Sequence, residues 1–101
     1  MKGKYTIVLY PKALDDMDKI YRYIYNILRA PEYAMAQLER LENGMFGLEE
    51  LPLRCAERKS GSYGNCGYRE LLVDNYTVIY RVNEDQRQVQ IVTVQYNKRN
   101  C

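Results

Sequence analysis

Two arginines stand inside apolar stretches of the segment GYRELLVDNYTVIYRV, which covers residues 67–82. Arg69 and Arg81 belong to two expected strands on either side of a turn. A strand arginine that faces water is ordinary, but several on one face would form an anion site. A guanidinium is a planar fork that matches two phosphate oxygens. Three further cations in the preceding segment are candidate phosphate ligands: Arg54, Arg58 and Lys59.

Composition limits the other kinds of chemistry. The chain of 101 residues contains no histidine, which excludes imidazole catalysis and histidine metal ligation. Its three cysteines, Cys55, Cys66 and Cys101, match no zinc spacing and no disulfide framework. We therefore expect no metal and no cofactor. Residues 52–101 carry 8 Lys and Arg against 5 Asp and Glu, so any cationic surface belongs to this half.

The first half of the chain is predicted to form a strand and two helices. The stretch KYTIVLY at 4–10 is rich in β-branched and aromatic residues, which is typical of a strand. Apolar residues then recur every three or four positions in two stripes, separated by the break RAPEY at 29–33. Such helices, joined by a few residues, are expected to form an antiparallel hairpin. The stripes are Leu14, Met17, Ile20 or Tyr21, Ile24 and Ile27 or Leu28, followed by Ala34, Leu38, Leu41, Met45 and Leu48.

The second half is predicted to form a loop at 54–67 and strands at about 67–73, 75–82 and 88–95. In the middle strand, Tyr76, Val78, Tyr80 and Val82 share one face, which suits a core under the helices. Thr77, Ile79 and Arg81 share the other face, where we expect the cations to gather. The predicted fold class is α+β, in the order β-α-α-β-β-β. A single domain over residues 1–101 would have the helix hairpin on one face of a mostly antiparallel, twisted sheet.

This order of elements resembles the RelE/ParE superfamily of bacterial type II toxins. The sharpest part of the resemblance is YRELLVDNYTVIYRV followed by VQIVTVQYNKRN. Members of this superfamily carry an arginine-containing strand, then a Y-x-V-x-Y-R-V strand, then a strand that ends in basic residues. The resemblance implies a small toxin made with an antitoxin from one operon and held inactive by it.

Two activities occur on this fold, and the resemblance leaves both open. RelE-like members enter the ribosomal A site and cleave mRNA as metal-independent endoribonucleases. ParE-like members bind and poison DNA gyrase without a catalytic set. A third reading is an inactive relic that still binds its antitoxin. We favour mRNA cleavage slightly because of the basic strand face.

The RelE-like reading implies roles for particular residues. Arg69, Arg81 and Tyr96 are the candidate catalytic residues, with the arginines stabilising the phosphorane and the tyrosine moving a proton. RelE-like nucleases usually have an arginine directly after the tyrosine of the middle strand, where this chain has Thr77. The general base is open between Glu70, Glu57 and Tyr96. Residues expected to bind RNA or a partner are Arg54, Arg58, Lys59, Lys98 and Arg99.

The expected partners follow from the same resemblance. The cognate antitoxin is expected to place a segment in the groove beside the helix hairpin or along an open sheet edge. The target would be the ribosome with its mRNA or, alternatively, DNA gyrase. The sequence contains no apolar run of membrane-spanning length, and the start MKGKYTIVLYP has too short an apolar stretch for a signal peptide. We therefore expect a cytoplasmic protein with no membrane partner.

Overall fold

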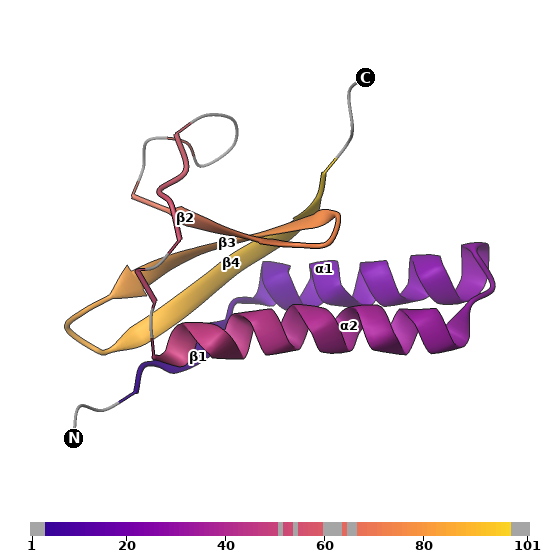
Figure 1. Ribbon diagram of the computed structural model, residues 1–101, viewed down its shortest axis with the longest axis horizontal. Helices are drawn as coiled ribbons and strands as arrows, with labels where there is room; N and C mark the ends of the chain where they lie inside the picture. Colours follow the sequence, from indigo (N-terminus) through magenta and orange to yellow (C-terminus); the bar gives the residue numbers. More distant parts are fainter. Residues whose placement is uncertain (1–3, 51, 54, 60–63, 65–66, 98–101) are drawn as a thin grey trace.

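The chain forms two layers, a helix hairpin packed on one face of a four-stranded sheet (Figure 1). The computed structural model describes residues 4–50, 52–53, 55–59, 64 and 67–97. Each main element lies within a few residues of its predicted range, and the α+β fold class is confirmed. The elements are β1 (Thr6–Leu9), α1 (Pro11–Arg22), α2 (Pro31–Phe46), β2 (Arg69–Val73), β3 (Tyr76–Asn83) and β4 (Gln88–Tyr96).

The sheet has the strand order β1-β4-β3-β2. β3 pairs antiparallel with both β2 and β4, whereas β1 lies parallel to β4. A bulge shifts the β3–β4 register between Ile79 and Tyr80, which increases the local twist. β1 is only 4 residues long and β4 is 9, so β4 extends well beyond its parallel neighbour. No helix in the described part of the chain is long and apolar enough to cross a membrane.

The core lies between the two helices and the helix-facing side of the sheet. α2 buries Ala34, Leu41 and Met45, as its apolar stripe predicts. β3 buries Val78 and Tyr80 against them, and the Tyr80 hydroxyl donates to the Pro52 carbonyl oxygen at 2.7 Å. Truncating a fully buried side chain of this size costs about 2–5 kcal/mol, so these positions hold the two layers together.

The predicted stripe on the first helix is correct at its centre and wrong at its ends. Met17 and Ile24 are buried, but Leu14 is 57% and Ile27 is 65% exposed. At the start of α1, Ala13 takes the inward position in place of Leu14. At the other end, the helix continues as a π-helical turn, Tyr23–Ile27. A π turn accommodates more residues than an α turn and rotates the following side chains out of the α-helical stripe.

Candidate functional site

Arg81 lies where the sequence places it, on the face of β3 opposite the helices, called the far face below. Its Nε donates to the Gln90 Oε1 at 2.8 Å, and its guanidinium carbon lies 6.0 Å from the centre of the Tyr68 ring. Arg81 itself is exposed, but its neighbours Thr77 and Ile79 on this face are 3% and 0% exposed. The far face of β3 is therefore closed at its centre and presents a cation only at one end.

Arg69 lies on the opposite face from Arg81, which corrects the expectation that the strand arginines gather. The β2–β3 register pairs Arg69 with Tyr80, and directly paired residues point to the same side of a sheet. Tyr80 belongs to the helix-side core, and so does Leu71, which lies two positions after Arg69 in β2. The Arg69 Nη1 donates to the Cys55 carbonyl oxygen at 2.6 Å, so this guanidinium braces the chain segment that precedes β2.

The loop cations are only partly described. Arg54, Lys98 and Arg99 lie outside the described residues, and Lys59 is exposed. Glu57 forms an isolated antiparallel β-bridge with Arg69 on the outer edge of β2, and Arg58 is the next residue in the chain. The Arg58 Nη1 lies 2.5 Å from the Glu70 Oε1, and the two side chains are 17% and 33% exposed. This ion pair occupies both Arg58 and Glu70, one of the candidate bases.

Tyr96 lies at the far end of β4, on the same side of the sheet as Tyr76. The two rings meet edge to face with centroids 5.5 Å apart, and Tyr96 remains 62% exposed. Arg81 pairs with Gln90, six positions before Tyr96 on the same strand. At about 3.3 Å per residue, that separation is roughly 18–20 Å. Acid–base chemistry on one phosphate needs heavy atoms within about 3 Å, so these candidates form no common centre.

A groove lies at the end of the helix hairpin, where the hairpin extends past the end of the sheet (Figure 1). Its volume is about 490 Å³. Apolar and tyrosine side chains dominate its walls, and we call it the hairpin-end groove. It is lined by Lys19, Ile20, Tyr23, Ile24 and Leu28 of the first helix, Tyr33 and Gln37 of α2, and Asn75, Tyr76 and Tyr96 of the sheet. The predicted groove beside the hairpin is therefore present.

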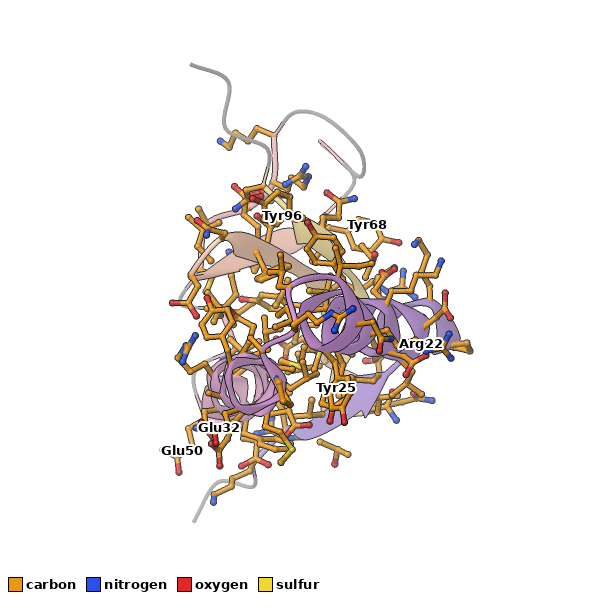
Figure 2. The ribbon with its side chains drawn as sticks, turned by 90° about the vertical axis from the view of Figure 1, so that its right-hand side faces the viewer. Arg22, Tyr25, Glu32, Glu50, Tyr68 and Tyr96 are labelled. Carbon is orange, nitrogen blue, oxygen red and sulfur yellow. The ribbon has the colours of Figure 1, made fainter. Side chains whose placement is uncertain are left out.

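The π-helical turn and the chain reversal shape one wall of this groove. The Leu28 N–H donates to the Tyr23 carbonyl oxygen at 3.2 Å, and Arg29 then adopts a left-handed φ of 55°. As a result, Tyr23 and Leu28 are half exposed at the groove while Ile24 remains in the core. Figure 2 shows Tyr96 beside the upper strands of the view and Tyr25 below the first helix.

The opposite wall is held by Asp74 in the β2–β3 turn. Its Oδ2 accepts from the Arg40 Nε at 2.6 Å and from the Gln37 Nε2 at 3.0 Å. The Arg40 guanidinium, and then the Gln37 amide, hold the pKa of the Asp74 carboxyl below its usual range. These contacts link α2 to the turn whose next residues, Asn75 and Tyr76, line the groove. Burial raises the pKa of the Tyr76 hydroxyl, so this groove tyrosine stays protonated.

A free sheet edge borders the groove at Tyr96. The Asn97 N–H donates to the Asn75 carbonyl oxygen at 2.8 Å, which makes Tyr76 and Tyr96 a non-hydrogen-bonded pair. The backbone N–H and C=O of Tyr96 therefore point away from β3. On that side β1 pairs with β4 only as far as Ile91. An incoming extended chain can thus pair with Tyr96 while its side chains enter the groove.

The arrangement supports binding better than catalysis. Within the described residues, no group of cysteine, aspartate and glutamate side chains is placed to hold a metal ion. The groove offers aromatic and aliphatic walls, a buried amide at Gln37 and a cation at Lys19. Sequence reasoning missed Tyr23, Tyr33 and Gln37. The signal that could have found them is the group of tyrosines on both sides of the break RAPEY. These tyrosines make the end of the hairpin more apolar than a surface facing water requires.

Solved structures with a similar fold include two toxin–antitoxin systems and one isolated toxin. No curated protein matches the sequence. The chromosomal ParDE toxin–antitoxin system from P. aeruginosa is similar in structure, with a TM-score of 0.78 and 21% identity over 96% of this chain and 100% of that chain. The RelBE2 toxin–antitoxin complex from Mycobacterium tuberculosis has a TM-score of 0.65 and 20% identity over 96% and 95%. The isolated E. coli RelE toxin has a TM-score of 0.61 and 18% identity over 95% and 87%.

Identities this low establish a shared fold, and the sequence itself adds a family. A sequence model described as the ParE toxin of the type II toxin–antitoxin system parDE matches residues 7–101. The match covers β1 from Ile7 onward, both helices and the three later strands, including the hairpin-end groove and the free edge at Tyr96. The chain therefore belongs to the ParE toxin family of type II toxin–antitoxin systems.

Proposed function

We propose that this protein is a toxin that inhibits DNA gyrase by binding it, and that it does not cleave mRNA. The observation that carries the proposal is the separation of Arg69, Arg81 and Tyr96 over two faces and two ends of the sheet. A metal-independent nuclease needs a cation, a base and an acid around one phosphate. A gyrase-binding toxin needs only a stable scaffold with exposed surfaces. Membership of the ParE family supports the same choice.

The sequence-based preference for mRNA cleavage thus becomes the second candidate. One observation favours mRNA cleavage: on the far face, Arg81 lies beside the Tyr68 ring. RNA-binding surfaces use this combination of a cation and an aromatic ring. Glu70, however, is engaged by Arg58, and Tyr96 is at the distant end of β4. An RNA bound at Arg81 would therefore find Glu70 held in an ion pair and Tyr96 out of reach.

We also propose that an antitoxin segment binds the hairpin-end groove and the free edge at Tyr96. The structural relatives from P. aeruginosa and M. tuberculosis are described as toxin–antitoxin systems or complexes. The groove offers half-exposed apolar anchors, chiefly Tyr23, Leu28 and Tyr33. A segment that places apolar side chains between the helices and the sheet, and pairs its backbone with Tyr96, would cover them. Ordering a flexible segment costs free energy, so tight binding requires a long contact.

Purified gyrase tests the target. The toxin is expected to inhibit supercoiling of relaxed plasmid, or to leave cleaved plasmid that requires gyrase and ATP. Adding the antitoxin should reverse the effect. The proposal fails if soluble, folded toxin affects neither supercoiling nor DNA integrity while it arrests growth on induction. Binding of the antitoxin with no arrest and no gyrase effect would instead identify an inactive relic.

The antitoxin site is tested by exchanging exposed apolar side chains. Leu28→Ser removes a half-exposed anchor in the groove, and Leu72→Ser is the matched control because Leu72 is 67% exposed on β2, outside the groove. We expect Leu28→Ser to weaken antitoxin binding about tenfold or more, which is the effect of an interface anchor, and Leu72→Ser to leave it unchanged. Equal effects of the two exchanges in calorimetric titration would rule out the groove as the binding site.

A further inference from the structure

A stripe of apolar side chains runs along the first helix, outside the hairpin-end groove. Tyr21 and Tyr25 lie one helical turn apart and stack with ring centroids 5.6 Å apart. Leu14 lies two turns before Tyr21, and residues at this spacing share one side of a helix. On α2, Met35 and Phe46 have the same separation as Leu14 and Tyr25. Each helix of the hairpin therefore carries one apolar stripe of matching length.

The two stripes lie along the seam between the helices. On α1, Asp16 accepts from the Val94 N–H at the β4 edge, and on α2, Arg40 donates to Asp74 beside β2. β4 and β2 lie on opposite sides of β3, so these two helix flanks point away from each other. At about 100° per residue, each stripe is about 120° or more around its helix from such a contact. Each stripe therefore lies on the flank that faces the other helix.

The side chains along the seam are exposed although they are large and apolar. Leu14, Tyr25, Met35 and Phe46 are each between 46% and 63% exposed. Figure 2 shows Tyr25 below the helices and Tyr96 above them. Single apolar side chains on a surface are common, but several along one seam mark an interaction site. The seam patch is defined here as Leu14, Tyr21, Tyr25, Met35 and Phe46.

Acidic side chains of α2 border the seam patch. Glu32, Glu39 and Glu42 are exposed, and none of them forms an ion pair with another described residue. Glu39 and Glu42 follow Met35 by one and two helical turns, so they lie on the same side of α2. Arg40, the one cation in the sequence of α2, is engaged by the β2–β3 turn. The glutamates of α2 are therefore not neutralised by their own helix.

The first helix does not neutralise them either. Its exposed acids are paired within the helix, Asp15 with Lys19 and Asp18 with Arg22. Exposed pairs of this kind leave little net charge on their helix. The seam thus combines an apolar floor with an excess of negative charge on its α2 side. A partner that fits both features has an apolar side flanked by cations.

We propose that the seam patch binds a cationic amphipathic helix of a protein partner. The apolar side of such a helix lies in the seam, and its lysine or arginine side chains meet Glu39 and Glu42. From Leu14 to Tyr25 the patch extends about 16 Å, at about 1.5 Å per residue, which about three turns of a partner helix cover. A second copy of this chain is a poor occupant, because two seam patches in contact bring the glutamates of both copies together. The proposal depends on neither gyrase nor the antitoxin.

The charge complementarity is tested with a fluorescent peptide of leucine and lysine at amphipathic helical spacing, followed by anisotropy. Wild-type toxin should bind it, and should not bind the same peptide with glutamate in place of lysine. Glu39→Gln combined with Glu42→Gln should weaken binding about fivefold or more at low salt, the effect of two exposed ion pairs. Glu57→Gln combined with Asp85→Asn is the matched control, because it removes the same charge from exposed residues outside the hairpin.

The apolar contact is tested by exchanging single exposed side chains. Met35→Ser removes an anchor of the seam patch and should weaken peptide binding about tenfold. Leu28→Ser in the hairpin-end groove and Leu72→Ser on β2 should leave it unchanged. Because all these side chains are exposed, circular dichroism should show every variant to be folded.

Each other outcome overturns the proposal. Folded wild type that does not bind the lysine peptide at low salt has no such docking surface. Equal weakening by the two double exchanges would show attraction by net charge alone, without a site on α2. Loss of binding in Leu28→Ser but not in Met35→Ser would place the peptide in the hairpin-end groove. Equal binding of the lysine and glutamate peptides would remove the charge preference.

Discussion

Replacing Asp74 with alanine is expected to loosen the wall of the hairpin-end groove formed by the β2–β3 turn. Two losses can be estimated. The Gln37 amide is 2% exposed and donates to Asp74 at 3.0 Å, and leaving such a donor unpaired costs about 1–3 kcal/mol. Asp74 also has a left-handed φ of 54°, where alanine costs about 1–2 kcal/mol. Together they predict a loss of about 2–5 kcal/mol in the free energy of unfolding.

Two further exchanges separate these causes. Glycine adopts the left-handed φ without strain but offers Gln37 no acceptor. Asp74→Gly should therefore lose only the contribution of the Gln37 hydrogen bond, about 1–3 kcal/mol of unfolding free energy. Asp74→Asn keeps an acceptor and tolerates the φ, so it should lose less than about 1 kcal/mol. The exposed ion pair with Arg40 is screened by salt, and its share should vanish in concentrated NaCl.

Urea denaturation followed by circular dichroism measures the whole series at constant m-value. The expected order of stability is wild type, then Asp74→Asn, Asp74→Gly and Asp74→Ala. A loss in Asp74→Ala below about 0.5 kcal/mol, the range of an ordinary surface exchange, would refute the reasoning. So would an Asp74→Gly variant that is less stable than Asp74→Ala, because backbone strain would then not contribute. Antitoxin binding should weaken in the same order, since the turn carries part of the groove.

Three shorter predictions concern packing, pH and activity. A Cβ on Gly44, inside α2, would lie 3.0 Å from the Val73 Cγ2. Overpacking costs about 1–3 kcal/mol and the better helix propensity of alanine offsets about 1 kcal/mol, so Gly44→Ala should lower the unfolding free energy by up to about 2 kcal/mol. Val73→Ala should relieve that loss in a double-mutant cycle, and additive losses would contradict this contact. Burial raises the pKa of Asp16, but hydrogen bonds from Thr93, Val94 and Lys12 outweigh it and the net pKa is lowered. The stabilising contribution of the Asp16 carboxylate is therefore complete above its unfolded-state pKa and is lost as pH falls through its folded-state pKa. Asp16→Asn should flatten the acid side of the plot of unfolding free energy against pH. An acid side that is unchanged in this variant would contradict the prediction. Arg81→Ala should leave gyrase inhibition intact, whereas loss of inhibition would place Arg81 at the gyrase contact.

The fold was largely predictable because its local signals agree with one another. Pro11 and Pro31 begin the two helices, and the stripe from Ala34 to Leu48 lies in the core as its spacing requires. The exposed end of the first helix was not predictable in this way. An α-helical period cannot anticipate a π turn, which depends on how the hairpin reverses at Arg29.

The placement of the candidate site depended on register, which the sequence left ambiguous. β2 reads RELLV, with apolar residues on both faces, so alternation alone does not say which face meets the helices. Pairing with Tyr80 decides it and sends Arg69 to the helix side. The groove was expected only in outline, because its walls come from three segments distant in sequence. The bonds of Asp74 to Gln37 and Arg40 likewise span more than thirty positions and leave no local pattern.

The most direct measurement is a translating extract that contains mRNA, gyrase and relaxed plasmid in one reaction. After addition of the toxin, plasmid topology and mRNA ends are read from the same samples. If the toxin acts by binding gyrase, supercoiling fails or gyrase-dependent cleaved plasmid accumulates while the mRNA stays intact. New mRNA ends at codon-defined positions, abolished by Arg81→Ala, with normal supercoiling would contradict the account.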